Sequence, residues 1–90
     1  MTIRLHLLIK GRVQGVGYRW FARDTAGQMA LSGWVRNLVS GDVEAEVEGD
    51  PGTLRKFIGE LKTGLPFARV SAIQEREVPA KGDKEPFDIY

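Results

Sequence analysis

A glycine-rich segment that ends in an arginine is the part of the sequence best suited to chemistry. The segment GRVQGVGYR, from Gly11 to Arg19, follows an alternating apolar run and precedes a helical pattern. Glycines let the main chain approach a ligand closely, and the N–H groups of such a loop and helix start can converge on an anion. Arg19, in the first helical turn, has a planar guanidinium that can hold two phosphate oxygens. The spacing fits an anion site and, equally well, a tight strand-to-helix turn with a surface arginine.

The hydrophobic pattern around this segment predicts an alternation of strands and helices. Strands are expected at 3–10, 32–38, 43–48 and 68–78, with a short terminal strand at 87–90 and a bulge near Ala72-Ile73. Helices are expected at 18–31 and from Pro51 to Gly64, the second with Asp50 as its N-cap. The order β-α-β-β-α-β indicates an α+β, ferredoxin-like sandwich over residues 1–90. In it, right-handed crossovers place both helices on one face of a four-stranded antiparallel sheet. This architecture serves many functions and decides none of them.

The amino-acid composition limits the kinds of function that this protein could have. The chain of 90 residues is 42% hydrophobic and 28% charged, as in ordinary globular domains, and its formal net charge of +1 gives no overall case for nucleic acid or an anionic membrane. It has no cysteine, which excludes disulfides, a thiolate nucleophile and cysteine metal sites and fits a reducing compartment. No signal peptide or membrane span is evident, so the expected location is the cytoplasm. The P-loop and GxGxxG motifs are both absent.

Two segments carry a resemblance to a known family. GRVQGVGYR resembles the first signature of the acylphosphatases, and GWVRNLVSGDVEAEVEG, from Gly33 to Gly49, resembles their second. The resemblance runs from Ile3 to about Val78 and is greatest to the small bacterial members. Tyr18 stands where many members have phenylalanine, which keeps the ring.

The resemblance implies hydrolysis of acyl phosphates to a carboxylate and inorganic phosphate. It implies that Arg19 binds the phosphate and that Asn37 orients the attacking water. The loop amides that share phosphate binding map to Gly15, Val16, Gly17, Tyr18 and Arg19. A carboxylate leaving group, whose acid has a pKa of about 4, departs without a general acid. We therefore expect in-line attack with no metal and no cofactor, by a monomer whose only partners are acyl phosphate and inorganic phosphate.

Other polar and aromatic residues have plainer explanations. His6 has no second histidine with which to share a metal, so a surface or packing role is expected. Asp24 is expected on the helix surface, although it could steer Arg19, and Trp20 and Trp34 are expected in the core rather than at the edge of the site. Period-two spacing predicts a solvated stripe of glutamates on the third strand, formed by Glu44, Glu46 and Glu48.

Two other functions share parts of this pattern. RNA-recognition modules have the same element order but place aromatic rings where this chain has glutamates, which would repel phosphates. A non-catalytic anion-binding domain could keep the loop, but the presence of both Arg19 and Asn37 favours catalysis. Acylphosphatase-like domains also occur within larger hydrogenase-maturation proteins, a context that the sequence leaves open.

Overall fold

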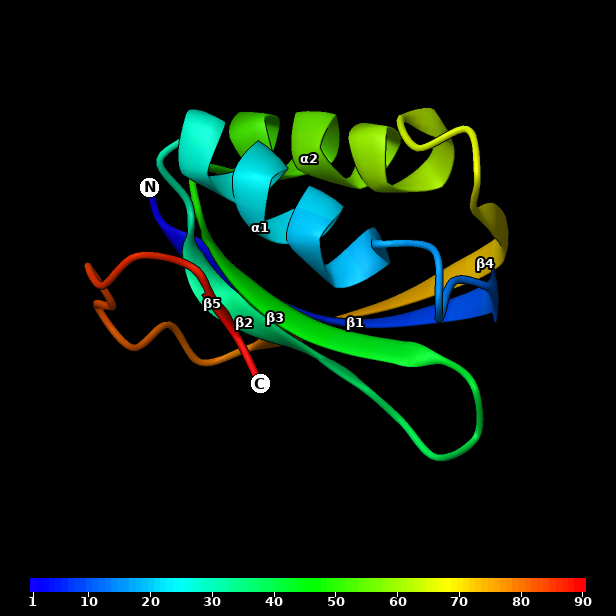
Figure 1. Cartoon of the computed structure of the whole chain (residues 1–90). Coiled ribbons are helices and arrows are strands. Elements are labelled where there is room, and N and C mark those ends of the chain that lie inside the picture. The colour runs from blue at the N-terminus through cyan, green and yellow to red at the C-terminus, as the bar shows by residue number, and fades with distance from the viewer.

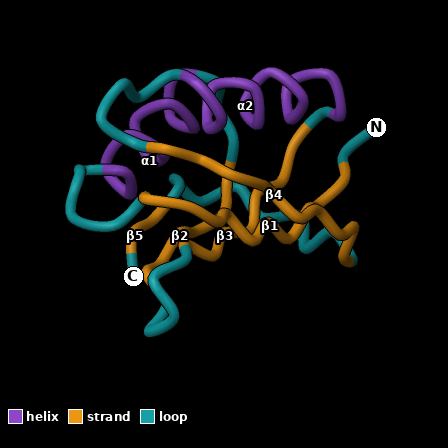
Figure 2. The backbone as a smooth tube through the Cα atoms, turned by 90° about the vertical axis from the view of Figure 1, so that its right-hand side faces the viewer, coloured by secondary structure: helices purple, strands orange, loops and turns teal.

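Two helices lie side by side across one face of a twisted β-sheet, and no helix covers the opposite face (Figures 1 and 2). The computed structural model describes all residues, 1–90. The helices are α1 (Tyr18–Gln28) and α2 (Pro51–Thr63). The strands are β1 (Ile3–Arg12), β2 (Ser32–Asn37), β3 (Val43–Gly49), β4 (Arg69–Val78) and β5 (Asp88–Ile89).

The strand order confirms the ferredoxin-like fold, and the short terminal strand expected at 87–90 joins the four-stranded sheet as β5. The sheet runs β4-β1-β3-β2-β5, with antiparallel pairing everywhere except between β2 and β5. The segment 79–87 crosses the end of the sheet and returns the chain beside β2, where β5 pairs in parallel. The predicted bulge is present: the register between β1 and β4 passes from Ala72 to Val70, which leaves Ser71 as the extra residue.

Local sequence accounts for both ends of α2 but for only one end of α1. The Asp50 side chain accepts hydrogen bonds from the N–H groups of Gly52 and Thr53 at 3.0 and 3.3 Å, and the helix ends before Gly64, as predicted. The expected extension of α1 to residue 31 is wrong, because the helix ends at Gln28. Ala30 adopts a left-handed conformation at φ 56°, so the last turn closes without the glycine that usually signals it.

The core lies between the helices and the sheet. The buried faces of β1, β2 and β3 contribute alternate aliphatic residues, and α2 contributes the i, i+3, i+4, i+7 set Leu54, Phe57, Ile58 and Leu61. Neither helix is long and apolar enough to cross a bilayer.

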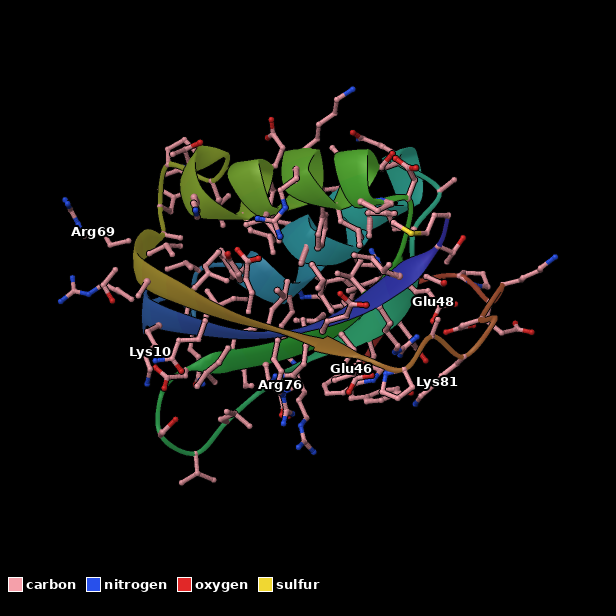
Figure 3. The ribbon with its side chains drawn as sticks, turned by 180° about the vertical axis from the view of Figure 1, so that it is seen from behind. Lys10, Glu46, Glu48, Arg69, Arg76 and Lys81 are labelled. Carbon is pink, nitrogen blue, oxygen red and sulfur yellow. The ribbon has the colours of Figure 1, made fainter.

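The prediction of a solvated glutamate stripe is wrong. On the sheet face opposite the helices, Arg4 is 1% exposed and donates to Glu46 at 2.6 Å and to Glu48 at 3.1 Å. Glu48 also accepts from the main-chain N–H groups of Lys81 and Asp83 at 2.8 and 3.1 Å. The segment after β4 thus covers this end of the face, where Lys81 contacts Glu48 (both labelled in Figure 3). The alternation of glutamates along β3 cannot reveal that the segment around Lys81, 33 positions after Glu48, buries the Glu48 side chain.

Replacing Glu48 by glutamine is expected to lower the free energy of unfolding by about 2 kcal/mol at neutral pH, because a buried charged acceptor is lost. Hydrogen bonds from Lys81 and Asp83 and the charge of Arg4 lower the pKa of Glu48. A lowered pKa stabilises the fold above the ordinary glutamate value of about 4.3, and this contribution is lost as the pH falls through the lowered pKa. Urea unfolding from pH 7 to pH 2 measures the difference. Glu77→Gln, at an exposed position, is the control. The assignment would be contradicted if the difference in unfolding free energy between Glu48→Gln and wild type grew as the pH falls.

Candidate active site

The loop between β1 and α1 is held by an apolar anchor and by two glycines in an unusual backbone conformation. Val13 is 1% exposed and packs into the core. Gly15 and Gly17 have φ of 77° and 79°, in the left-handed region that L-residues avoid. A Cβ atom at either position would meet nothing within 4 Å, so conformation rather than crowding requires glycine. Gly11 belongs to β1 and not to the loop.

The N–H groups of this loop are available to a ligand. None of the turn, loop and cap hydrogen bonds of the main chain is donated by Gly15, Val16 or Gly17. Tyr18 and Arg19 begin α1, where N–H groups have no partner within the helix. Gly17 is the N-cap and has no side chain to satisfy them. A run of free donors at the positive end of a helix favours an anion.

The Arg19 side chain contacts Tyr90, the residue that follows β5. Its Nη1 donates to the main-chain oxygen of Tyr90 at 3.1 Å. Tyr90 is itself fixed, because its N–H donates to the Val35 carbonyl at 2.9 Å and its ring stacks on Trp34 with centroids 5.7 Å apart. The sequence showed a terminal strand but nothing that would bring Tyr90 to Arg19, since 71 positions separate them.

Asn37 lies at the end of β2 and is exposed. It pairs with Val43, whose side chain is buried under the helices, so both residues belong to the helix-covered face of the sheet. The loop before α1 and the turn from β2 to β3 lie at the same end of the sheet (Figure 1). This placement brings Asn37 and the glycine loop together.

One small cavity joins these residues. It has a volume of about 200 Å³ and is lined by residues of the loop, the first turn of α1 and the end of β2: Val13, Gly15, Gly17, Tyr18, Arg19, Trp20 and Asn37. Val16 is not among the lining residues, and its side chain packs against the core. A larger groove of about 860 Å³ lies between α1 and the segment 83–87 and contains neither Arg19 nor Asn37.

Two aromatic residues border the cavity in different ways. Tyr18 is buried, its hydroxyl donates to the Leu61 carbonyl at 2.7 Å, and burial raises the pKa of the phenol, so it stays protonated. Trp20 is 54% exposed and carries the Arg23 guanidinium over its ring at 4.6 Å. The expectation of a core position for Trp20 is therefore wrong: the helix turns this ring toward the rim of the site.

The remaining candidate residues lie outside the cavity. His6 contacts Glu44 at 2.7 Å on the open face of the sheet, and the hydrogen bond from His6, with Arg36 on the other oxygen, lowers the pKa of Glu44. Asp24 accepts from Arg23 rather than from Arg19. Trp34 is half-buried on the open face and stacks on Tyr90, so the expectation of a core position for Trp34 is also wrong. The structure contains no group of three or more His, Asp or Glu side chains that could hold a metal ion.

The ferredoxin-like sheet and the arginine beside a glycine loop place the chain among small α+β proteins that have a candidate anion site and no nucleotide-binding motif. The sequence model of the acylphosphatase family matches residues 5–89. The chain is 41% identical over 87 residues to an acylphosphatase of Clostridium beijerinckii, covering 97% of each chain. Its fold matches the crystal structure of acylphosphatase from Bacillus subtilis with a TM-score of 0.91 and 36% identity, covering 100% of this chain and 99% of that one.

The chain therefore belongs to the acylphosphatase family, which hydrolyses acyl phosphates, and it is a hydrolase of this type. It also matches full-length HypF with a TM-score of 0.86 and 32% identity, covering 100% of this chain and 12% of that one.

Proposed function

We propose that Arg19 and the amides of Gly15 to Arg19 hold the phosphoryl group while Asn37 orients a water molecule for in-line attack. The observation that carries the proposal is the shared cavity, because Arg19, the glycine loop and Asn37 line one space of about 200 Å³. Phosphoryl transfer passes through a loose transition state, so positioning and charge stabilisation supply most of the catalysis. Arg19 and the loop donors supply positive charge where the phosphoryl oxygens would lie.

Asn37 can place the water but cannot remove its proton. An amide is not a base at ordinary pH, but its carbonyl accepts from water while its NH₂ donates. Water attacks phosphorus as the bond to the carboxylate oxygen breaks, and the carboxylate leaves with the bonding electron pair. The proton of the attacking water passes to a phosphate oxygen or to solvent. No step in this sequence uses a metal ion or a general acid.

We also propose that residues 1–90 act as one catalytic domain, as a monomer in the cytoplasm. A single chain supplies every group that the mechanism uses, and a composition without cysteine fits a reducing compartment.

Acyl phosphates are expected to be hydrolysed at least about 10³-fold more efficiently than an alkyl phosphate monoester, because an alkoxide leaving group needs protonation and the cavity has no acid to supply it. The Tyr18 hydroxyl is committed to the Leu61 carbonyl, and its raised pKa makes it a poor acid. The measurement compares kcat/KM for benzoyl phosphate and glycerol phosphate, with and without EDTA. Comparable rates on the two substrates, or loss of activity in EDTA that magnesium restores, would contradict the mechanism.

A further inference from the structure

The Gln14 side chain joins the phosphate-binding loop to the turn that follows Asn37. Its Nε2 donates to the Leu38 carbonyl at 2.7 Å and to the Asp42 carbonyl at 2.8 Å. These carbonyls also close the turn itself, since Leu38 N–H donates to Asp42 at 2.9 Å and Gly41 N–H donates to Leu38 at 3.1 Å. Both amide hydrogens of one glutamine therefore bind the base of the turn, one residue beyond Asn37.

Gln14 lies in the loop between a residue that is fixed in the core and a glycine that has no side chain. Val13 before it is fixed in the core, whereas Gly15 after it has a left-handed φ and no side chain to hold it. The Gln14 amide is thus the polar contact between the loop and the β2–β3 turn. Gln14 does not line the cavity, so it touches the turn and not the space where phosphate would bind.

We infer that Gln14 is a positioning residue that sets the distance between the bound phosphoryl group and the water held by Asn37. The inference rests on the roles proposed above for Arg19 and Asn37. The loop holds the phosphoryl group and β2 carries Asn37, so the two reacting partners lie on separate elements. A displacement of about 1 Å between reacting groups can cost about 10²-fold in rate.

The first test replaces Gln14 by methionine, which keeps the length of the side chain and removes both donors. We expect kcat for benzoyl phosphate to fall by about 10²-fold while the inhibition constant of inorganic phosphate changes little. Gln14→Lys, which restores N–H donors at similar reach, is expected to recover most of the lost kcat. Unchanged kcat in Gln14→Met, or parallel loss of kcat and phosphate affinity, would overturn the inference.

A matched control separates positioning from simple anchoring of the turn. Lys10 also contacts the turn, through an ion pair with the Asp42 carboxylate at 3.1 Å, but it lies on the open face of the sheet. Exposed ion pairs contribute about 1 kcal/mol or less, so Lys10→Met is expected to leave kcat within a few-fold of wild type. A loss of kcat in Lys10→Met equal to that in Gln14→Met would mean that any anchor of the turn suffices, against a specific role for Gln14.

The decisive measurement combines Gln14→Met with Asn37→Ala. If Gln14 acts through Asn37, the double variant is no slower than Asn37→Ala alone, whereas multiplied losses would overturn the inference. If Gln14→Met does not fold by circular dichroism, Gln14→Asn replaces it in the same cycle, because its amide is one methylene too short to reach both carbonyls.

The same cycle distinguishes this inference from the proposed mechanism. If Asn37→Ala has wild-type turnover, both the proposed mechanism and the proposed role of Gln14 are contradicted. If Asn37→Ala is slow but Gln14→Met is fully active, only the proposed role of Gln14 is contradicted.

Discussion

Replacement of Arg19 by alanine is expected to reduce kcat for an acyl phosphate by about 10³-fold or more, since an arginine on a transferring phosphoryl group stabilises charge that nothing else in the cavity carries. Affinity for inorganic phosphate should fall as well, because the same guanidinium grips the group before and during transfer. Arg19→Lys should rescue poorly, since an ammonium cannot reproduce the planar fork. Calorimetry with phosphate, beside kcat, measures both effects.

The control for Arg19→Ala removes an equal charge elsewhere. Arg55 is an exposed arginine on α2 that pairs with Glu75 on β4, far in the fold from the glycine loop. Arg55→Ala should leave both turnover and phosphate binding near wild type. A folded Arg19→Ala protein that keeps wild-type turnover would remove Arg19 from the mechanism.

Replacement of Asn37 by alanine is expected to separate turnover from binding. If Asn37 only places the water, kcat should fall by about 10²-fold or more while phosphate affinity stays almost unchanged. Asn37 is exposed at the end of β2 and takes no part in the core, so the fold should persist. The same calorimetric and kinetic measurements apply, with circular dichroism to verify folding.

The matched control for Asn37→Ala is Val39→Ala, since Val39 is fully exposed in the turn that follows β2 and does not line the cavity of the candidate site. It should behave as wild type. The assignment of Asn37 fails if Asn37→Ala loses phosphate binding as completely as Arg19→Ala does.

Short-range patterns predict the elements of this fold well. The Asp50-Pro51 start of α2 has a local cause in the cap hydrogen bonds, and the break in alternation near Ala72 corresponds to the extra residue Ser71. The patterns fail where the cause is distant or unusual. The end of α1 depends on a left-handed alanine, Ala30, and the burial of Glu48 depends on a segment that reaches it after β4.

In the candidate site too, some features could be predicted from the sequence and others could not. The glycine spacing and Arg19 follow from local chemistry, and the resemblance to acylphosphatases supplies Asn37. The contact of Arg19 with Tyr90 and the two hydrogen bonds from Gln14 to the turn join segments 71, 24 and 28 positions apart. Pairings at such separations depend on which individual side chains and loop residues meet in the folded protein, and the periodicity that predicts the topology does not specify them.

The open space around Gly15 and Gly17 means that the sequence of the glycine loop is restricted by handedness and not by volume. There is room for a methyl group at both positions, yet an L-residue resists the positive φ that the backbone has there. The two glycines act here as achiral units in a chiral chain. A D-amino acid, whose preferred φ is the mirror image, would meet both the space and the turn without strain.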